Sequence, residues 1–263
     1  MKIDLSFDAK HALVCGASDG IGRAIARGLA AHGASVTLLA RRRDRLEALA
    51  EELTDVGASE VRTLVFDLDE RDELCSTIDA LVTERGPVHI LVNNTGGPSP
   101  GPILEAAPED FQVGLGRHLF ASQLLVKSVL PGMREAGFGR IINVISTSVR
   151  EPIPNLGVSN TVRGAMASWA KTVAGELPPG ITINNLLPGL TDTERLTSLR
   201  GSIAARTGQS EEAVLEGWRQ QVPEGRLAQP EELAAAVVFL ASPAASYIRG
   251  ISLPVDGGRL HCI

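Results

Sequence analysis

The sequence predicts an α/β fold in which a doubly wound parallel sheet of about seven strands carries helices on both faces. Two observations lead to this prediction. Short apolar runs rich in β-branched residues alternate with longer segments of helical period, almost to the end of the chain. The short runs are apolar nearly throughout, as strands buried on both faces are. Because 263 residues suit a single α/β domain and no linker interrupts them, we expect one domain, residues 1–263.

The individual elements follow from the same alternation. The predicted strands are residues 11–15, 35–39, 61–66, 88–92, 139–145, 181–187 and 251–255. The predicted helices are the segments 21–32, 42–53, 71–85, 109–135, 157–177 and 230–241. Residues of about 190–226 form one long irregular stretch, and insertions of this kind are often lids. We expect this stretch to cover a substrate; a helical excursion that shields a hydrophobic edge is the alternative.

Composition and charge exclude several classes of protein. The formal net charge is −6 and charged residues make up 21% of the chain, which argues against both disorder and a basic nucleic-acid-binding surface. No apolar run approaches the roughly 18 residues of a membrane span, and the N-terminus lacks the apolar core of a signal peptide. Cys15, Cys75 and Cys262 are too far apart for a disulfide framework or a metal site. A cytoplasmic protein without nucleic-acid, membrane or metal partners is expected.

A glycine-rich turn follows the first predicted strand and opens the first predicted helix. It reads Cys15-Gly16-Ala17-Ser18-Asp19-Gly20-Ile21-Gly22. Glycines at these spacings let the backbone turn tightly and approach a dinucleotide diphosphate, which the free N–H groups and positive dipole of the helix start then bind. At this place in a βαβ unit the pattern is specific. It predicts a single-domain Rossmann fold with a dinucleotide site formed by Gly16, Ser18, Asp19, Gly20, Ile21 and Gly22.

The end of the second predicted strand indicates which dinucleotide binds. Sites that prefer NAD usually place a carboxylate there to hold the ribose 2′-hydroxyl, whereas an arginine suits the 2′-phosphate of NADP. Here the strand runs into Arg41, Arg42 and Arg43. We therefore expect NADP rather than NAD, with Arg41 as the main contact and Arg42 beside it. Asp19 argues mildly against this because it adds negative charge nearby, and a solvated helix start at 41–45 is the alternative.

Motifs spread along the chain resemble those of the short-chain dehydrogenase/reductase family, particularly its 3-oxoacyl-carrier-protein reductase-like members. The glycine turn matches the family's first motif except that Cys15 replaces a Thr. The resemblance implies a nicotinamide-dependent oxidoreductase. It covers essentially the whole chain and its ordered motifs are highly specific. The further matches are Asp67, Asn93-Asn94-Thr95-Gly96, Pro188-Gly189-Leu190-Thr191-Asp192-Thr193, Arg226, Pro230-Glu231-Glu232 and Asp256-Gly257-Gly258.

The resemblance also implies where the cofactor lies and how the chains assemble. Relatives usually form tetramers through two long helices, here 109–135 and 157–177, so a homotetramer is expected. The second helix carries Met166, Trp169 and Val173 at helical spacing, which would serve that interface or else pack in the core. The implied cofactor contacts are Asp67 and Leu68 at the adenine, Asn93, Thr95 and Gly96 near the adenosine ribose, and Pro188, Gly189, Thr191 and Thr193 beside the nicotinamide.

The residues that the family uses to transfer a proton are replaced in this chain. In the family a Tyr supplies the proton, a Lys four residues later lowers that Tyr's pKa and binds the nicotinamide ribose, a Ser orients the carbonyl, and an Asn completes a relay. The Ser is present as Ser146. The Tyr and Lys positions hold Ser159 and Arg163, and the Asn position holds His118. The one tyrosine, Tyr247, lies far along the chain.

The substitutes retain part of this chemistry. Ser146 and Ser159 can hydrogen-bond a carbonyl. Arg163, with a reference pKa of roughly 12.5 or higher, can hold ribose hydroxyls and stabilise an oxyanion but cannot shuttle protons. His118 is the nearby group expected to titrate near neutrality, since a reference His pKa is about 6.5. Helix packing is the alternative role for His118, and solvent contact the alternative for Ser159.

Three functions are compatible with these residues. The first is an NADP-dependent reductase of altered chemistry that acts on a small or acyl-type carbonyl compound, or on the alcohol, with water or His118 as proton source. The second is a non-catalytic dinucleotide-binding sensor or scaffold, and the third is a dehydratase-like proton transfer by His118. The substrate-covering stretch would suit an apolar substrate with an acidic end, because it holds Leu196, Leu199, Ile203, Val214 and Trp218 beside Arg195, Arg200 and Arg206.

Overall fold

Seven parallel strands form the centre of the molecule. A computed structural model describes residues 3–262. It orders the strands β3-β2-β1-β4-β5-β6-β7, each hydrogen-bonded in parallel to its neighbours. The order reverses between β1 and β4, as in doubly wound sheets, so the predicted fold class is confirmed. The strands are β1 (His11–Cys15), β2 (Ser35–Ala40), β3 (Val61–Val65), β4 (Ile90–Asn93), β5 (Gly139–Val144), β6 (Ile181–Pro188) and β7 (Ser252–Val255).

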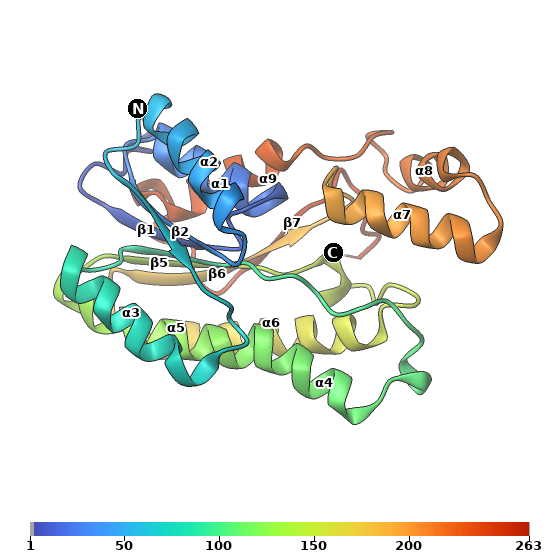
Figure 1. The fold of residues 1–263 in the computed structure, drawn as a ribbon, viewed down its shortest axis with the longest axis horizontal. Helices are drawn as coiled ribbons and strands as arrows, with labels where there is room; N and C mark the ends of the chain where they lie inside the picture. Colours follow the sequence, from blue (N-terminus) through green and yellow to red (C-terminus); the bar gives the residue numbers. More distant parts are fainter. Residues whose placement is uncertain (1–2, 263) are drawn as a thin grey trace.

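Helices cover both faces of the sheet (Figure 1). Each face has its own apolar core, because successive side chains of a strand point to opposite sides. Val14 and Ile142 pack in one core, whereas their neighbours Leu13 and Ile141 pack in the other. The first core is covered by α1 (Gly20–Ala31), α2 (Arg43–Asp55) and α9 (Pro230–Ala241), and the second by α3 (Arg71–Arg85), α5 (Ala121–Glu135) and α6 (Gly157–Glu176).

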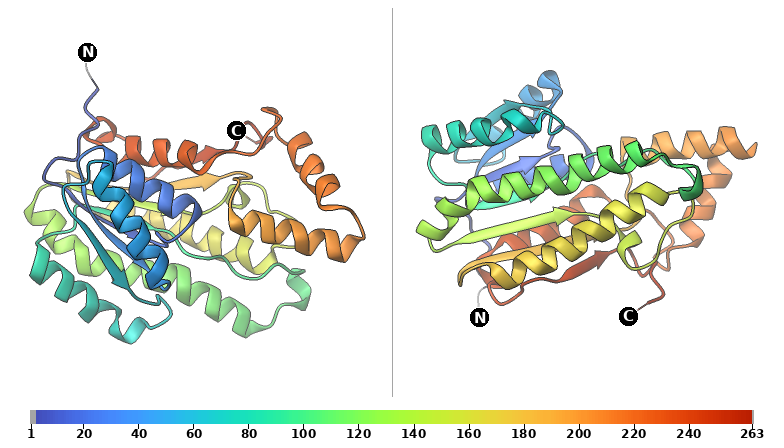
Figure 2. Two further views of the ribbon diagram at one scale, coloured as in Figure 1. Left: turned by 45° about the horizontal axis from the view of Figure 1, so that its top comes forward. Right: turned by 90° about the horizontal axis from the view of Figure 1, so that it is seen from below.

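Two predicted segments differ from the structure. The helix predicted at 109–135 is divided into α4 (Pro108–Leu115), a π-helical turn (Gly116–Phe120) and α5. The stretch of about 190–226, predicted to be irregular, holds α7 (Glu194–Thr207) and α8 (Glu211–Gln220), which lie at one end of the sheet (Figure 2). That prediction is wrong because α7 buries only Ala204 and shows little apolar period, and because α8 is a helix of only 10 residues, whose apolar face with Val214 and Leu215 was not recognised in the sequence. The other boundaries agree to within one or two residues.

Buried amides cross the sheet from β4 to β7. Asn93 Nδ2 donates to Asn143 Oδ1 at 2.8 Å, Asn143 Nδ2 to Asn185 Oδ1 at 2.9 Å, and Asn185 Nδ2 to Ser252 Oγ at 3.1 Å. The three asparagines are buried, so losing a partner would leave an amide both desolvated and unpaired. The ladder therefore helps to fix the register of these strands, and it keeps the side chain of Asn93 buried against β5.

Met166, Trp169 and Val173 on α6 contact the apolar cores of this chain. Met166 is buried against Ile145 and Leu187, so the core alternative holds for it. Trp169 Nε1 donates to Gln123 Oε1 at 2.7 Å and thereby joins α6 to α5. Of the helices within residues 3–262, none combines the length and apolar character needed to cross a bilayer.

Acid is expected to destabilise the fold through His11. This residue begins β1, is 8% exposed, and has its Nε2 2.8 Å from Thr37 Oγ1. Burial, with a smaller contribution from His89, lowers the pKa of His11 from 6.5 to about 4. Between these values the unfolded chain binds a proton that the folded protein does not. Stability contributed by neutral His11 is therefore lost as the pH falls from about 6.5 to about 4.

The expected loss between pH 7 and pH 4 is about 3 kcal/mol of unfolding free energy, at roughly 1.4 kcal/mol per pKa unit. Urea unfolding at both pH values measures it in the wild type and in His11→Gln. Glutamine keeps a hydrogen-bonding side chain but binds no proton in this range, so the variant should lose about 3 kcal/mol less than the wild type. Equal losses in the two proteins would contradict the role of His11.

Candidate functional site

A cleft of about 450 Å³ lies at the carboxyl-terminal ends of the strands. Open α/β sheets bind their ligands there, where the strand order reverses. The segments at the ends of β1 to β6 line the cleft together with α6 and α7. Most residues predicted for the site are in its lining: Gly16, Ser18, Asp19, Gly20, Ile21, Arg41, Arg42, Asp67, Leu68, Thr95, Gly96, Ser146, Ser159, Arg163, Pro188, Gly189, Thr191 and Thr193.

Three predicted site residues do not line the cleft. The side chain of Asn93 belongs to the buried amide ladder, and the next residue, Asn94, lines the cleft. His118 is 3% exposed and also lies outside the lining. Gly22 is buried and packs against the backbone of Gly16. Sequence spacing cannot distinguish these positions, because burial depends on elements that are distant in the chain.

The glycine turn has the geometry that its sequence predicts. Gly16 and Gly20 have φ values of +61° and +50°, which L-residues with a Cβ rarely adopt. A Cβ on Gly22 would lie 2.1 Å from the carbonyl oxygen of Gly16, so α1 could not pack this closely against the turn. Asp19 caps α1 and accepts a hydrogen bond from the Gly20 N–H at 2.7 Å. The turn thus brings the positive end of α1 to the cleft.

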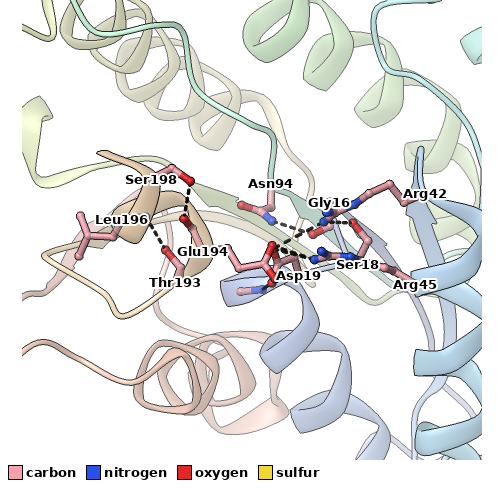
Figure 3. A network of polar contacts seen from close by, with 11 residues as sticks. Gly16, Ser18, Asp19, Arg42, Arg45, Asn94, Thr193, Glu194, Leu196 and Ser198 are labelled. Carbon is pink, nitrogen blue, oxygen red and sulfur yellow. Dashed lines mark hydrogen bonds and ion pairs between the residues drawn. The ribbon is translucent and has the colours of Figure 1, made fainter. Parts of the chain in front are cut away.

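Arginines at the end of β2 neutralise the acidic residues near the turn. Arg41 Nη1 lies 3.6 Å from Asp67 Oδ2. Arg42 Nη2 lies 3.5 Å from Asp19 Oδ2 and donates to Ser18 Oγ at 3.2 Å (Figure 3). Because the Arg42 guanidinium already faces the Asp19 carboxylate, this carboxylate repels a bound phosphate less than the sequence position of Asp19 alone suggests.

An ion pair joins the glycine turn to the start of α7. Arg45 Nη1 lies 3.3 Å from Asp19 Oδ2 and 2.9 Å from Glu194 Oε2 (Figure 3). The hydrogen bond that Glu194 accepts raises the pKa of Arg45. Thr193 caps α7 by accepting from the Leu196 N–H at 3.3 Å. These contacts hold the first turn of α7 next to the glycine turn that precedes α1.

The residues at the other end of the cleft come from β5 and α6. Ser146 Oγ accepts a hydrogen bond from the Ser148 N–H at 3.0 Å, which leaves its own hydroxyl proton available. Ser159 and Arg163 are buried on one face of α6, and Arg163 Nη1 donates to the Val144 carbonyl at 2.9 Å. Burial, followed by the charge of Arg195, lowers the pKa of Arg163 to about 9, so it remains a cation at neutral pH.

His118 cannot act as a cationic acid near neutral pH. It lies in the π-helical turn, where its Nδ1 contacts Thr95 Oγ1. Burial, followed by the charges of Arg163, Arg117 and Arg195, lowers the pKa of His118 to about 2. The prediction that His118 titrates near neutrality is therefore wrong, because the sequence could reveal neither its burial nor the arginines around it. A reaction driven by its protonation loses its basis.

Some lining residues were not identified from the sequence. Arg117 Nε donates to Asp69 Oδ1 at 3.1 Å, and this pair links the π-helical turn to the loop after β3. Only the fold brings those elements together, so no spacing reveals them. The one signal for Arg117 in the sequence was its position directly before His118. The other unassigned lining residues are apolar: Leu39, Ala40, Phe66, Val144, Ile145 and Leu156.

Known proteins match nearly the whole chain in sequence. A family model described as Enoyl-(Acyl carrier protein) reductase matches residues 16–259. The 3-oxoacyl-acyl-carrier-protein reductase of Vibrio harveyi is 34% identical over 257 residues, which cover 97% of this chain and 98% of that protein. Gluconate 5-dehydrogenase of Gluconobacter oxydans is 32% identical over 254 residues, with 96% and 95% covered.

Solved structures of similar proteins also match nearly the whole chain. L-sorbose reductase from Gluconobacter frateurii, complexed with NADPH and L-sorbose, has a TM-score of 0.93 and 32% identity, with 99% of this chain and 100% of that chain covered. A variant of actinorhodin polyketide ketoreductase with NADPH has a TM-score of 0.89 and 31% identity, with 96% and 98% covered. The sheet and glycine turn define a Rossmann-fold protein whose relatives are oxidoreductases. The chain belongs to the short-chain dehydrogenase/reductase family.

Proposed function

We propose that this protein is an NADP-dependent oxidoreductase that transfers hydride between the nicotinamide and a carbonyl or hydroxyl substrate without the Tyr and Lys of its family. The observation that carries the proposal is the convergence of Ser146, Ser159 and Arg163 on the cleft that the glycine turn borders. The NADPH-bound reductases among its structural relatives support it. Its substrate is small or 3-oxoacyl-like.

The cleft fits a dinucleotide on this chain's own geometry. The positive φ values of Gly16 and Gly20 bring the tight glycine turn and the positive end of α1 to the cleft, which suits a diphosphate. Arg41, Arg42 and Ser18 would hold a 2′-phosphate, since two guanidinium groups and a hydroxyl meet at the end of β2. Asp67 and Leu68 would hold the adenine end, and Thr193 with Pro188 the nicotinamide end.

The chain's own residues would hold the substrate and stabilise charge. A bound nicotinamide supplies or accepts the hydride. Ser146 and Ser159 donate hydrogen bonds to the carbonyl oxygen, and the Arg163 cation stabilises the negative charge that develops on it. Because a serine hydroxyl does not ionise near neutrality and His118 stays neutral, water in the open cleft provides the proton. Helix α7 covers the substrate, with Leu196 and Leu199 in the lining, whereas no residue of α8 lines the cleft.

Assembly belongs to the same proposal. A homotetramer would form through the surface of α5 and α6, as the family resemblance implies. Val113 and Phe120, which are 56% and 49% exposed beside this helix pair, support such an interface. Size-exclusion chromatography with light scattering measures the assembly, and a monomer at micromolar concentration would refute it.

The proposed function is tested by following NADPH and NADH oxidation with a panel of ketones, aldehydes, sugars and oxo acids. NADPH should be oxidised faster. Arg41→Ala should raise the Kd for NADPH roughly 10- to 100-fold while changing the Kd for NADH little, because one charge-assisted contact to the 2′-phosphate is lost. Arg43→Ala is the matched control, since Arg43 pairs with Glu47 at 3.6 Å and lies outside the cleft lining. A preference for NADH, or equal effects in both variants, would contradict the proposal.

A second candidate function is a dinucleotide-binding protein without turnover. It is favoured by the position of the one tyrosine, because Tyr247 is fully exposed and lies outside the cleft lining. Tight NADPH binding without oxidation by any carbonyl compound in the panel would favour this candidate. Measurable turnover on any of them would exclude it.

A further inference from the structure

The arginines that line the cleft fall into two groups. Those at the adenine end each have a carboxylate partner, whereas Arg163 and Arg195 form no ion pair with any carboxylate in residues 3–262. Arg163 is buried and Arg195 is exposed, so two cations without counter-charges border one end of the cleft in a protein of net charge −6. The paired arginines are Arg41 with Asp67, Arg42 with Asp19, and Arg117 with Asp69.

The two unpaired guanidinium groups converge on Gly97. Arg195 Nη1 donates to the Gly97 carbonyl at 3.3 Å. The position that a Cβ on Gly97 would occupy lies 2.6 Å from Arg195 Nη2 and 3.3 Å from Arg163 Nη2. The glycine therefore leaves room for both groups. The charge of Arg195 adds to the effect of burial in lowering the pKa of Arg163.

The proposed cofactor does not account for Arg195. In the proposed function its phosphates face the glycine turn and the arginines after β2, at the other end of the cleft. Arg163 lies one helical turn from Ser159, where the substrate carbonyl would be held. Arg195 borders the same region from the first turn of α7, and its fork still has donors beyond the one that Gly97 accepts.

We propose that the substrate carries a carboxylate and that Arg195 binds it beside Arg163. This inference rests on the proposed function and names its substrate class, an oxo acid or hydroxy acid. A planar guanidinium matches the two oxygens of a carboxylate. The neighbouring lining is apolar, with Leu156, Leu196 and Leu199, and so suits a carbon chain rather than the further oxygens of a phosphate.

The test compares 2-oxo, 4-oxo and 5-oxo carboxylates with their methyl esters, which keep the carbonyl but lose the charge. At the best chain length the wild-type kcat/KM for the acid should exceed that for its ester at least tenfold. Arg195→Gln should lower this acid-to-ester ratio at least tenfold and leave the Kd for NADPH within threefold. Arg200→Gln is the matched control on α7, because Arg200 pairs with Glu211 at 3.0 Å and lies outside the cleft lining. The control should keep the wild-type ratio.

Three outcomes would overturn the carboxylate site: equal kcat/KM for acid and ester in the wild type, an unchanged ratio in Arg195→Gln, or a loss of NADPH affinity as large as the loss of acid turnover. If no probe is reduced, the proposed function fails separately. Calorimetry of the same acids and esters with the NADPH-loaded protein then decides the carboxylate site. Acid-selective binding that Arg195→Gln abolishes supports it, and equal binding of acid and ester refutes it.

Discussion

Replacement of Arg163 by leucine is expected to lower kcat for carbonyl reduction by roughly 10²–10³-fold, the usual cost of removing one group that stabilises a developing oxyanion. The expectation follows from what surrounds this residue. Ser159 takes the place of an acid but is a poor proton donor near neutral pH, so the negative charge that develops on the oxygen must be stabilised. Arg163 is a buried cation one helical turn away, and it keeps its charge at neutral pH because its pKa is about 9.

Arg163→Lys provides the control for this prediction. Lysine keeps the positive charge at the position where the family itself carries a lysine, so its kcat should stay within about tenfold of the wild-type value. Leucine also leaves the Val144 carbonyl without the donor that it has at 2.9 Å. Urea unfolding of both variants therefore has to accompany the kinetics. A leucine variant that is folded and retains kcat within threefold would remove Arg163 from the mechanism.

Local patterns were sufficient to predict much of this fold and the turn that borders the site. Strands buried on both faces carry apolar runs, and the glycine turn has a fixed spacing relative to β1 and α1, so both appear in the sequence itself. α7 and α8 could not be predicted in this way. α7 buries only Ala204 and α8 is short. Both begin at capping hydroxyls, Thr193 and Ser210, and such hydroxyls are common in loops as well.

The properties of individual side chains in the site depended on tertiary structure. His118 was expected to titrate near neutrality, but three arginines and burial act on it together. Asn93 matched a cofactor motif, yet its amide pairs with Asn143 across the sheet. In both cases the sequence shows the residue but not its neighbours. The neighbours could not be predicted because they lie on strands and helices that are distant in the chain.

The glycine turn gives the second of the two largest expected effects. Gly22→Ala would place a Cβ 2.1 Å from the Gly16 carbonyl oxygen and 2.7 Å from Asn94 Nδ2, far inside van der Waals contact. Backbone at Gly16 must then move, and overpacking of this kind typically costs about 1–3 kcal/mol of unfolding free energy. Because the proposed diphosphate contacts are backbone N–H groups of this turn, the Kd for NADPH should rise by roughly 100-fold or more.

Gly217→Ala separates this effect from the general consequences of replacing a glycine in a helix. Gly217 lies within α8, and a Cβ there would meet no atom within 4 Å. The control should therefore gain about 0.5–1 kcal/mol of stability by restricting the unfolded chain, with unchanged NADPH affinity. Calorimetric titration with NADPH and urea unfolding measure both quantities. If Gly22→Ala is folded and binds NADPH as the wild type does, the turn does not hold the cofactor, and the binding mode proposed for the whole cleft is refuted.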